Sequence, residues 1–174
     1  MIFYVTLIYG GDSLGKVILI CGKIGSGKTT YANKLAKQLN AVNISQDELM
    51  LGLFGAELYD NEPKKYEKYC AKVEDYVKLK AGEAAKAGAI VICENGFWSR
   101  SERDELRKFY ADMGVECELH YIDISEKQRL QNIKDRNEEI QQGKLHFYLT
   151  DDNDINHFFE IPDDWEVDMR VKIG

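Results

Sequence analysis

A glycine-rich run that fits the spacing G-x-x-x-x-G-K-[ST] is the first feature of this sequence that can do chemistry: it reads Gly22-Lys23-Ile24-Gly25-Ser26-Gly27-Lys28-Thr29. Glycines let backbone N–H groups approach and enclose phosphate oxygens without Cβ clashes. The lysine places a point charge on the β- and γ-phosphates, and the threonine hydroxyl is a ligand for Mg²⁺. The predicted binding residues are Gly22, Lys23, Ile24, Gly25, Ser26, Gly27, Lys28, Thr29 and Thr30. The structural alternative is a glycine-rich turn with a solvated lysine.

Two carboxylates follow apolar segments of the kind that form buried strands. Asp47 comes just after residues 41–44, and Glu94 ends the run from Ala89 to Cys93. In a parallel sheet the carboxyl ends of the strands open onto the ligand crevice. We expect Asp47 to act as a general base that accepts a proton from an attacking hydroxyl, although a carboxylate in the first turn of a helix is also favourable on electrostatic grounds alone.

Glu94 resembles the acidic residue of a Walker B element, which holds Mg²⁺ directly or through water. An acidic residue that ends a strand is also common without any such role. The neighbouring Asn95 is a candidate hydrogen-bond partner for a substrate or for water on the metal.

Cationic side chains over a γ-phosphate are the next requirement of phosphoryl transfer. Arg129 and Arg136 are seven positions apart, so they share a helix face if the helix persists, and a solvated basic face is the alternative. Arg100 and Arg103 fall in the first turn of another predicted helix, where the dipole disfavours cations. Binding of an anionic substrate, or pairing with Glu102 or Asp104, would compensate for the unfavourable interaction of these arginines with the helix dipole.

The elements that must position these residues alternate between strands and helices. Val17–Cys21 is a continuous apolar run typical of a strand buried on both faces. Further strands are predicted at 41–44, 89–93, 115–124 and 167–173, and helices follow three capping boxes, Ser45/Glu48, Ser99/Glu102 and Ser125/Gln128. A longer helix is predicted from Pro63 to Gly88, and the apolar stripes of other helices include Leu39 and Leu130. This alternation predicts an α/β fold with a parallel sheet.

The length of 174 residues suits one domain, with or without a lid. The net charge of −7 excludes a uniformly basic nucleic-acid-binding surface but leaves a local basic cleft open. No apolar run approaches the roughly 20 residues of a membrane span, and no membrane association is expected. The four cysteines lack C-x-x-C spacing, and Cys21 and Cys93 are predicted to be reduced core thiols of a cytoplasmic protein. Residues 1–15 are predicted to be an extension or an extra strand.

Together these segments resemble the small P-loop kinases, among them polynucleotide 5′-hydroxyl kinase, chloramphenicol phosphotransferase and zeta-toxin relatives. The resemblance covers about residues 16–137 and implies a P-loop NTPase three-layer sandwich of about five parallel strands, within a kinase domain at 16–174 that has a short lid near 136–150. It implies Asp47 as the base, Arg136 as a lid arginine on the transferring phosphoryl group, and Arg129 as a secondary candidate. Glu94 stands where the family usually carries aspartate, and Gln46 stands where an arginine often precedes the base.

The expected activity is transfer of the γ-phosphoryl group of ATP, with Mg²⁺, to a hydroxyl of a small molecule or a nucleic-acid end. The alternatives are a nucleotide hydrolase or switch, in which Glu94 positions water, and a non-catalytic nucleotide-binding protein. A nucleic-acid acceptor is not favoured, because the acidic chain would need a local groove near Arg100, Arg103 and Arg136.

Overall fold

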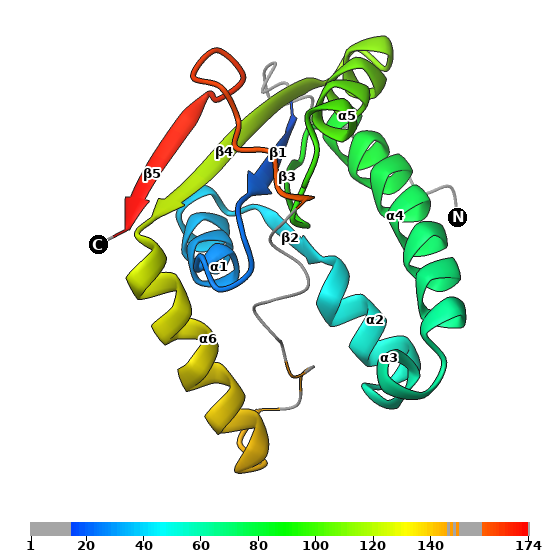
Figure 1. The fold of residues 1–174 in the computed structure, drawn as a ribbon. Helices are drawn as coiled ribbons and strands as arrows, with labels where there is room; N and C mark the ends of the chain where they lie inside the picture. Colours follow the sequence, from blue (N-terminus) through cyan, green and yellow to red (C-terminus); the bar gives the residue numbers. More distant parts are fainter. Residues whose placement is uncertain (1–14, 146, 148, 150–157, 174) are drawn as a thin grey trace, which may run out of the picture.

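The computed structural model describes residues 15–145, 147, 149 and 158–173, so the expectation for residues 1–14 lies outside the described residues. Five parallel strands form one sheet in the order β2-β3-β1-β4-β5 (Figure 1). Their bounds are β1 (Lys16–Cys21), β2 (Val42–Ser45), β3 (Ile90–Glu94), β4 (Glu116–Ile124) and β5 (Met169–Ile173). The predicted α/β class and parallel sheet are confirmed.

Helices connect the strands and cover the sheet on both sides (Figure 1). They are α1 (Lys28–Leu39), α2 (Gln46–Phe54), α3 (Glu57–Asn61), α4 (Pro63–Lys86), α5 (Arg100–Asp112) and α6 (Glu126–Gln141). The three predicted capping boxes start α2, α5 and α6, where each serine hydroxyl accepts a hydrogen bond from a backbone N–H three residues on. The short helix α3 was not predicted, and the first residues of the predicted lid, 136–141, are the last turns of α6.

Two hydrophobic cores follow from the alternation of side chains along β1. Val17, Leu19 and Cys21 face a core shared with α4 and α5, while Ile18 and Ile20 face a core shared with α1. Because both faces of the strand are covered, its whole sequence is apolar. Leu39 and Leu130, predicted on apolar stripes, are instead exposed, and Leu39 is the last residue of α1.

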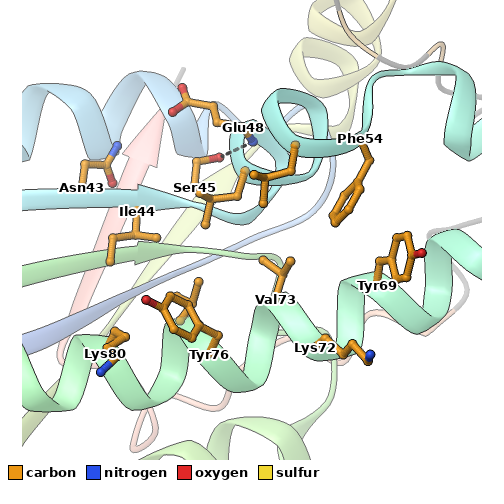
Figure 2. Close-up of a pocket in the computed structure, with 13 residues that line it drawn as sticks. Asn43, Ile44, Ser45, Glu48, Phe54, Tyr69, Lys72, Val73, Tyr76 and Lys80 are labelled. Atoms are coloured by element: carbon orange, nitrogen blue, oxygen red, sulfur yellow. Dashed lines mark hydrogen bonds between the residues drawn. The ribbon is translucent and has the colours of Figure 1, made fainter.

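An apolar groove lies beside β2, one of the two edge strands of the sheet, between α2 and α4 (Figure 2). Its volume is about 720 Å³. Ile44 and Val73 line its floor, and Phe54 stacks on Tyr69 at one end with ring centroids 4.6 Å apart. Neither the glycine-rich turn nor Asp47 lines this groove.

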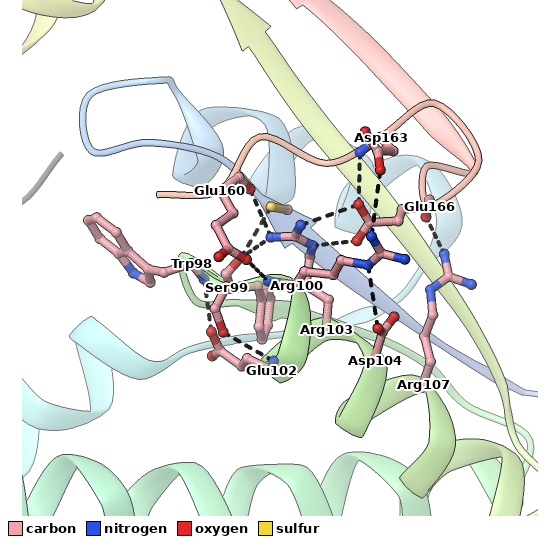
Figure 3. Close-up of polar contacts among 12 residues, drawn as sticks. Trp98, Ser99, Arg100, Glu102, Arg103, Asp104, Arg107, Glu160, Asp163 and Glu166 are labelled. Atoms are coloured by element: carbon pink, nitrogen blue, oxygen red, sulfur yellow. Dashed lines mark hydrogen bonds and ion pairs between the residues drawn. The ribbon is translucent and has the colours of Figure 1, made fainter. Parts of the chain in front are cut away.

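The segment that precedes β5 is fixed to the start of α5 by a buried ion pair (Figure 3). The Arg103 guanidinium donates through Nε to Glu166 Oε1 at 3.1 Å, and through Nη1 to the carbonyl oxygens of Phe97 at 3.1 Å and Glu160 at 3.0 Å. Both partners are almost fully buried, at 1% and 4% exposure. The Asp163 backbone N–H also donates to Glu166, so the carboxylate is well satisfied.

The structure places Arg100 and Arg103, which were predicted to bind substrate, in this network (Figure 3). Arg103 is buried and all of its described contacts join parts of the fold, so no face of its guanidinium is presented to a ligand. Arg100 is exposed, forms ion pairs with Asp104 and Asp163, and stacks its guanidinium on Trp165. The predicted pairing with Asp104 is found for Arg100, whereas Arg103 pairs with Glu166, a partner that was not predicted.

We predict that Glu166→Gln lowers the free energy of unfolding by about 3–5 kcal/mol, because it leaves the buried Arg103 charge without its counter-charge. Burial alone raises the pKa of Glu166, but the hydrogen bonds from Arg103 and from the Asp163 N–H outweigh it and lower the pKa. The stability that Glu166 contributes is therefore present above the unfolded-state pKa and is lost as the pH falls through the lowered folded-state pKa.

Urea unfolding measured at several pH values tests this expectation. The stability gap between the wild type and Glu166→Gln should shrink as the pH falls into the acid range. Glu160→Gln, whose carboxylate lies at an exposed site, should cost about 1 kcal/mol or less. A gap that stays constant with pH would contradict the proposed role of the ion pair.

Candidate active site

The turn between β1 and α1 has the backbone conformation that its glycines predict. Gly25 and Gly27 have φ angles of +76° and +92°, where side chains other than glycine are strained. A Cβ on Gly25 would also lie 2.6 Å from Ile133 Cγ1 of α6. Helix α1 begins at Lys28 with no acidic residue in its first turn and no side-chain cap, so its N-terminal dipole is not neutralised by those groups.

Helix α6 holds the outer side of this turn. Arg129 Nη1 donates to the Ile24 carbonyl at 3.1 Å, and Asn132 Nδ2 donates to the Gly25 carbonyl at 2.8 Å. Arg129 is 1% exposed and also pairs with a glutamate one turn earlier, so it supports the turn rather than lining the cavity. Arg136 lines the cavity, two turns further along the same helix.

The side chain of Lys28, the first residue of α1, folds back onto the start of the turn. Its ammonium group donates to the Gly22 and Lys23 carbonyl oxygens, each at 3.0 Å. Burial lowers the pKa of Lys28, while the carboxylates of Glu94 and Asp47 act in the opposite direction. A partly buried cation with two backbone acceptors among the described residues is suited to bind an incoming anion.

Glu94 and Thr29 meet at the carboxyl edge of the sheet. Glu94, 7% exposed, ends β3 next to Ile20 of β1, and its Oε1 accepts a hydrogen bond from the Thr29 hydroxyl. Burial raises the pKa of Glu94, which the Thr29 hydroxyl and Lys28 partly offset. Its second oxygen, Oε2, is buried without a hydrogen-bond partner among the described residues, as is the Ser26 hydroxyl. These orphaned oxygens fit a site that gains further polar partners when a ligand binds.

Asp47 lies in the first turn of α2, which its neighbour Ser45 caps. Ser45 pairs with Glu94 across the sheet, so both carboxylates lie at the same edge. Desolvation raises the pKa of Asp47, while Lys28 and Arg136 act to lower it. The Asp47 side chain nevertheless remains accessible to solvent through the cavity that it lines.

A cavity of about 610 Å³ joins these groups. The predicted residues that line it are Ile24, Gly25, Gly27, Lys28, Thr29, Thr30, Asp47, Glu94 and Arg136. Gly22, Lys23 and Ser26 complete the turn behind them; a Cβ on Gly22 would lie 2.7 Å from the Ser26 hydroxyl. Asn95 does not line this cavity, and its side-chain oxygen accepts a hydrogen bond from the Gly96 N–H instead.

Four aromatic side chains also line the cavity and are called the aromatic wall here; two of them, Tyr59 and Tyr66, were not predicted. Tyr59 of α3 and Tyr66 of α4 contact each other edge to face, with ring centroids 5.0 Å apart. Trp98 and Phe147 complete the wall, and the Arg136 guanidinium lies 5.0 Å from the Phe147 ring centroid. The sequence signal was weak, because Tyr66 also fits the apolar stripe of a helix.

Asn132 was missed as well. It lies three positions after Arg129 and four before Arg136, so the shared helix face already pointed to it.

No helix in the described part of the chain is long and apolar enough to cross a membrane. Within the same residues, no three His, Cys, Asp or Glu side chains gather as a metal site. All four cysteines are free, and Cys21 and Cys93 are buried as predicted.

Comparison with known proteins agrees with this geometry. An AAA domain family model, AAA_33, matches residues 17–146. No curated protein matches the chain in sequence. The fold resembles the Mycobacterium tuberculosis APS kinase CysC solved with AMPPNP and APS, at 21% identity and a TM-score of 0.64 over 91% of this chain and 88% of that one.

Two further structures share the fold. A putative kinase from Chloroflexus aurantiacus j-10-fl is 17% identical with a TM-score of 0.69, over 94% of this chain and 86% of that one. A chain of the Pnkp1/Rnl/Hen1 RNA repair complex is 18% identical with a TM-score of 0.60, over 83% of this chain and 52% of that one. These likenesses confirm a P-loop NTPase fold like that of small P-loop kinases. Because the family model covers most of its length, the chain belongs to the AAA_33 family of AAA domains.

Proposed function

We propose that this protein is an ATP-dependent kinase that transfers the γ-phosphoryl group to a hydroxyl of an acceptor. The observation that carries the proposal is the meeting of Lys28, Asp47 and Arg136 in one cavity beside the glycine-rich turn. Phosphoryl transfer requires charge stabilisation around the phosphate and a base for the incoming hydroxyl, and these residue types supply both.

The turn and Lys28 are proposed to hold the phosphates of the nucleotide. The backbone N–H groups of the turn and the N-terminus of α1 favour anions. The kinase-type fold and the family support a nucleotide as the ligand. Thr29 and Glu94 would hold Mg²⁺, since their oxygens already lie in hydrogen-bond contact and Mg²⁺ usually takes one or two protein ligands together with phosphate oxygens. The bound ion would neutralise charge on the phosphates.

Asp47 is proposed as the general base. The acceptor oxygen forms a bond to the γ-phosphorus while the bond from that phosphorus to the β–γ bridging oxygen breaks, ADP leaves, and the hydroxyl proton passes to Asp47. Desolvation raises the pKa of Asp47 above its ordinary value, which makes its carboxylate a better proton acceptor. Arg136 faces the same cavity and would stabilise the charge on the transferring group.

A hydrolase in which Glu94 positions water is less well supported by these contacts. The Glu94 carboxylate is bonded to the Thr29 hydroxyl at the proposed metal position, whereas Asp47 is the carboxylate that stays accessible in the cavity. Turnover of ATP should therefore rise when an acceptor is added, and it would not rise for a hydrolase.

Lys28→Met should weaken binding of Mg·ATP by about 10- to 150-fold, because it removes a charge-assisted contact with the phosphates. Isothermal titration calorimetry measures this directly. Lys34→Met is the matched control, since Lys34 is an exposed lysine of the same helix outside the cavity. Equal affinity of the Lys28 variant and the control would remove the proposed phosphate site.

Asp47→Asn should reduce phosphoryl transfer by about 10²- to 10⁴-fold while leaving ATP affinity within about twofold of wild type. The wild-type rate should rise with pH through a pKa that lies above the ordinary aspartate value, and Asp47→Asn should lack this rise. Product formation from labelled ATP, read by mass spectrometry over a pH series, gives both results. Transfer at the wild-type rate would show that Asp47 is not the base.

A further inference from the structure

We infer that the acceptor is an uncharged alcohol with a flat ring, which is held against the aromatic wall of Tyr59, Tyr66, Trp98 and Phe147 with its hydroxyl toward Asp47. This inference rests on the proposed kinase function and names the class of its second substrate. Two features of the cavity carry it: the aromatic side chains that line it, and the balance of charge among the lining residues.

The wall presents aromatic surface from four separate parts of the chain, Phe147 coming from the segment after α6. Tyr59 comes from α3, Tyr66 from α4, and Trp98 from the segment between β3 and α5, and all line the same cavity as Asp47. Tyr59 is 37% exposed although it is aromatic, so part of its surface is not packed in the hydrophobic core. Flat rings, whether of an aryl group or the apolar face of a sugar, bury area well against such side chains.

Trp98 is held in place by contacts that do not use the cavity. Its carbonyl accepts a hydrogen bond from the Glu160 N–H at 2.8 Å, and its ring meets Phe159 edge to face at 6.0 Å between centroids. A Cβ on Gly96 would lie 2.1 Å from Trp98 Nε1, so the ring lies directly against the Gly96 backbone. A wall fixed in this way is ready for a ligand before the ligand arrives, which reduces the entropy cost of binding.

The charges in the cavity do not suit an anionic acceptor. Among the described lining residues, the positive charges of Lys28 and Arg136 are balanced by the carboxylates of Asp47 and Glu94. A bound ATP with one Mg²⁺ would add about two net negative charges. A phosphorylated or carboxylated acceptor would then meet like charge in a partly desolvated site, which disfavours its binding.

Other nearby polar side chains do not alter this balance. Gln46, next to the proposed base, is neutral, and its side-chain amide donates to the Cys70 carbonyl of α4 at 3.5 Å. Arg103 is buried in its pair with Glu166, and Arg100 is paired with acidic residues outside the cavity. The sequence has two tryptophans, and the second, Trp165, is exposed and stacks on Arg100 rather than lining the cavity.

This arrangement permits a direct binding measurement. Trp165→Phe leaves Trp98 as the single tryptophan, so fluorescence reports on the aromatic wall alone. The protein, loaded with a non-hydrolysable ATP analogue and Mg²⁺, is titrated with matched pairs that differ in charge: para-hydroxymethyl benzamide against para-hydroxymethyl benzoate, and methyl glucoside against methyl glucuronide. Glycerol serves as an alcohol without a ring.

We expect the neutral member of at least one pair to change Trp98 emission and to bind about tenfold or more tightly than its anionic partner and than glycerol. The aryl pair and the sugar pair distinguish the two sources of a flat ring. Tighter binding of the anionic members, or no binding of either neutral ring alcohol, would overturn the inference.

Variants supply a second measurement, read by calorimetry. Trp98→Ala and Tyr59→Ala should each weaken binding of the preferred neutral probe by about tenfold, while the affinity for the ATP analogue stays unchanged. Trp165→Ala is the matched control and should bind like the wild type. Tyr59 is partly exposed, so its variant also answers the question if Trp98→Ala fails to fold. Unchanged affinity in Tyr59→Ala and in a folded Trp98→Ala would contradict the role of the wall.

These experiments distinguish a failure of the inference about the acceptor from a failure of the proposed kinase function. If neutral ring alcohols bind as expected but receive no phosphoryl group from ATP, the inference about the acceptor site stands and the proposed kinase function fails. If transfer occurs only to anionic alcohols, the kinase function stands and the inference fails.

Discussion

The close contact between the glycine-rich turn and helix α6 is the constraint on which the rest of the site depends. Gly25 lies so near Ile133 that a single Cβ would clash with it, and the Ile24 and Gly25 carbonyls are bonded to Arg129 and Asn132. Carbonyl oxygens directed at a phosphate would repel it, whereas these two are directed at α6. The same helix then carries Arg136 into the cavity. One contact thus fixes both the binding turn and the cation proposed to act on the transferring group.

The carboxyl edge of the sheet supplies the remaining groups. The register places Glu94 beside Ile20 of β1 and Ser45 of β2, so the ends of three parallel strands bring the turn, the proposed metal position and Asp47 to one edge. Their charges are coupled: Lys28 lies in the field of both carboxylates, and Arg136 lies in that of Asp47. Groups of opposite charge with shifted pKa values are typical of a binding site, and here a cavity joins them.

Local sequence pattern was enough to predict much of this arrangement. Continuous apolar runs predicted the buried strands, and serine capping predicted where α2, α5 and α6 begin, because both depend on contacts within a few residues. Side chains whose partners are distant in sequence were not predictable in the same way. Arg103 pairs with Glu166, 63 positions later, and its burial could not be read from its place in a first helical turn. Tyr59 and Tyr66 reach the cavity through the packing of α3 on α4 and of α4 on α2, which helical periodicity does not encode.

The charge balance and the aromatic lining of the cavity would give the proposed kinase a substrate specificity that its fold alone does not determine. P-loop folds of this shape are shared by proteins with different substrates, so specificity must come from the side chains that line the cavity beside the turn. The most direct test of the central claim is a crystal structure with a non-hydrolysable ATP analogue and Mg²⁺. The account predicts that the terminal phosphate lies between Lys28 and Arg136 and faces Asp47, with the metal on Thr29. A nucleotide bound elsewhere, such as in the apolar groove between α2 and α4, would contradict it.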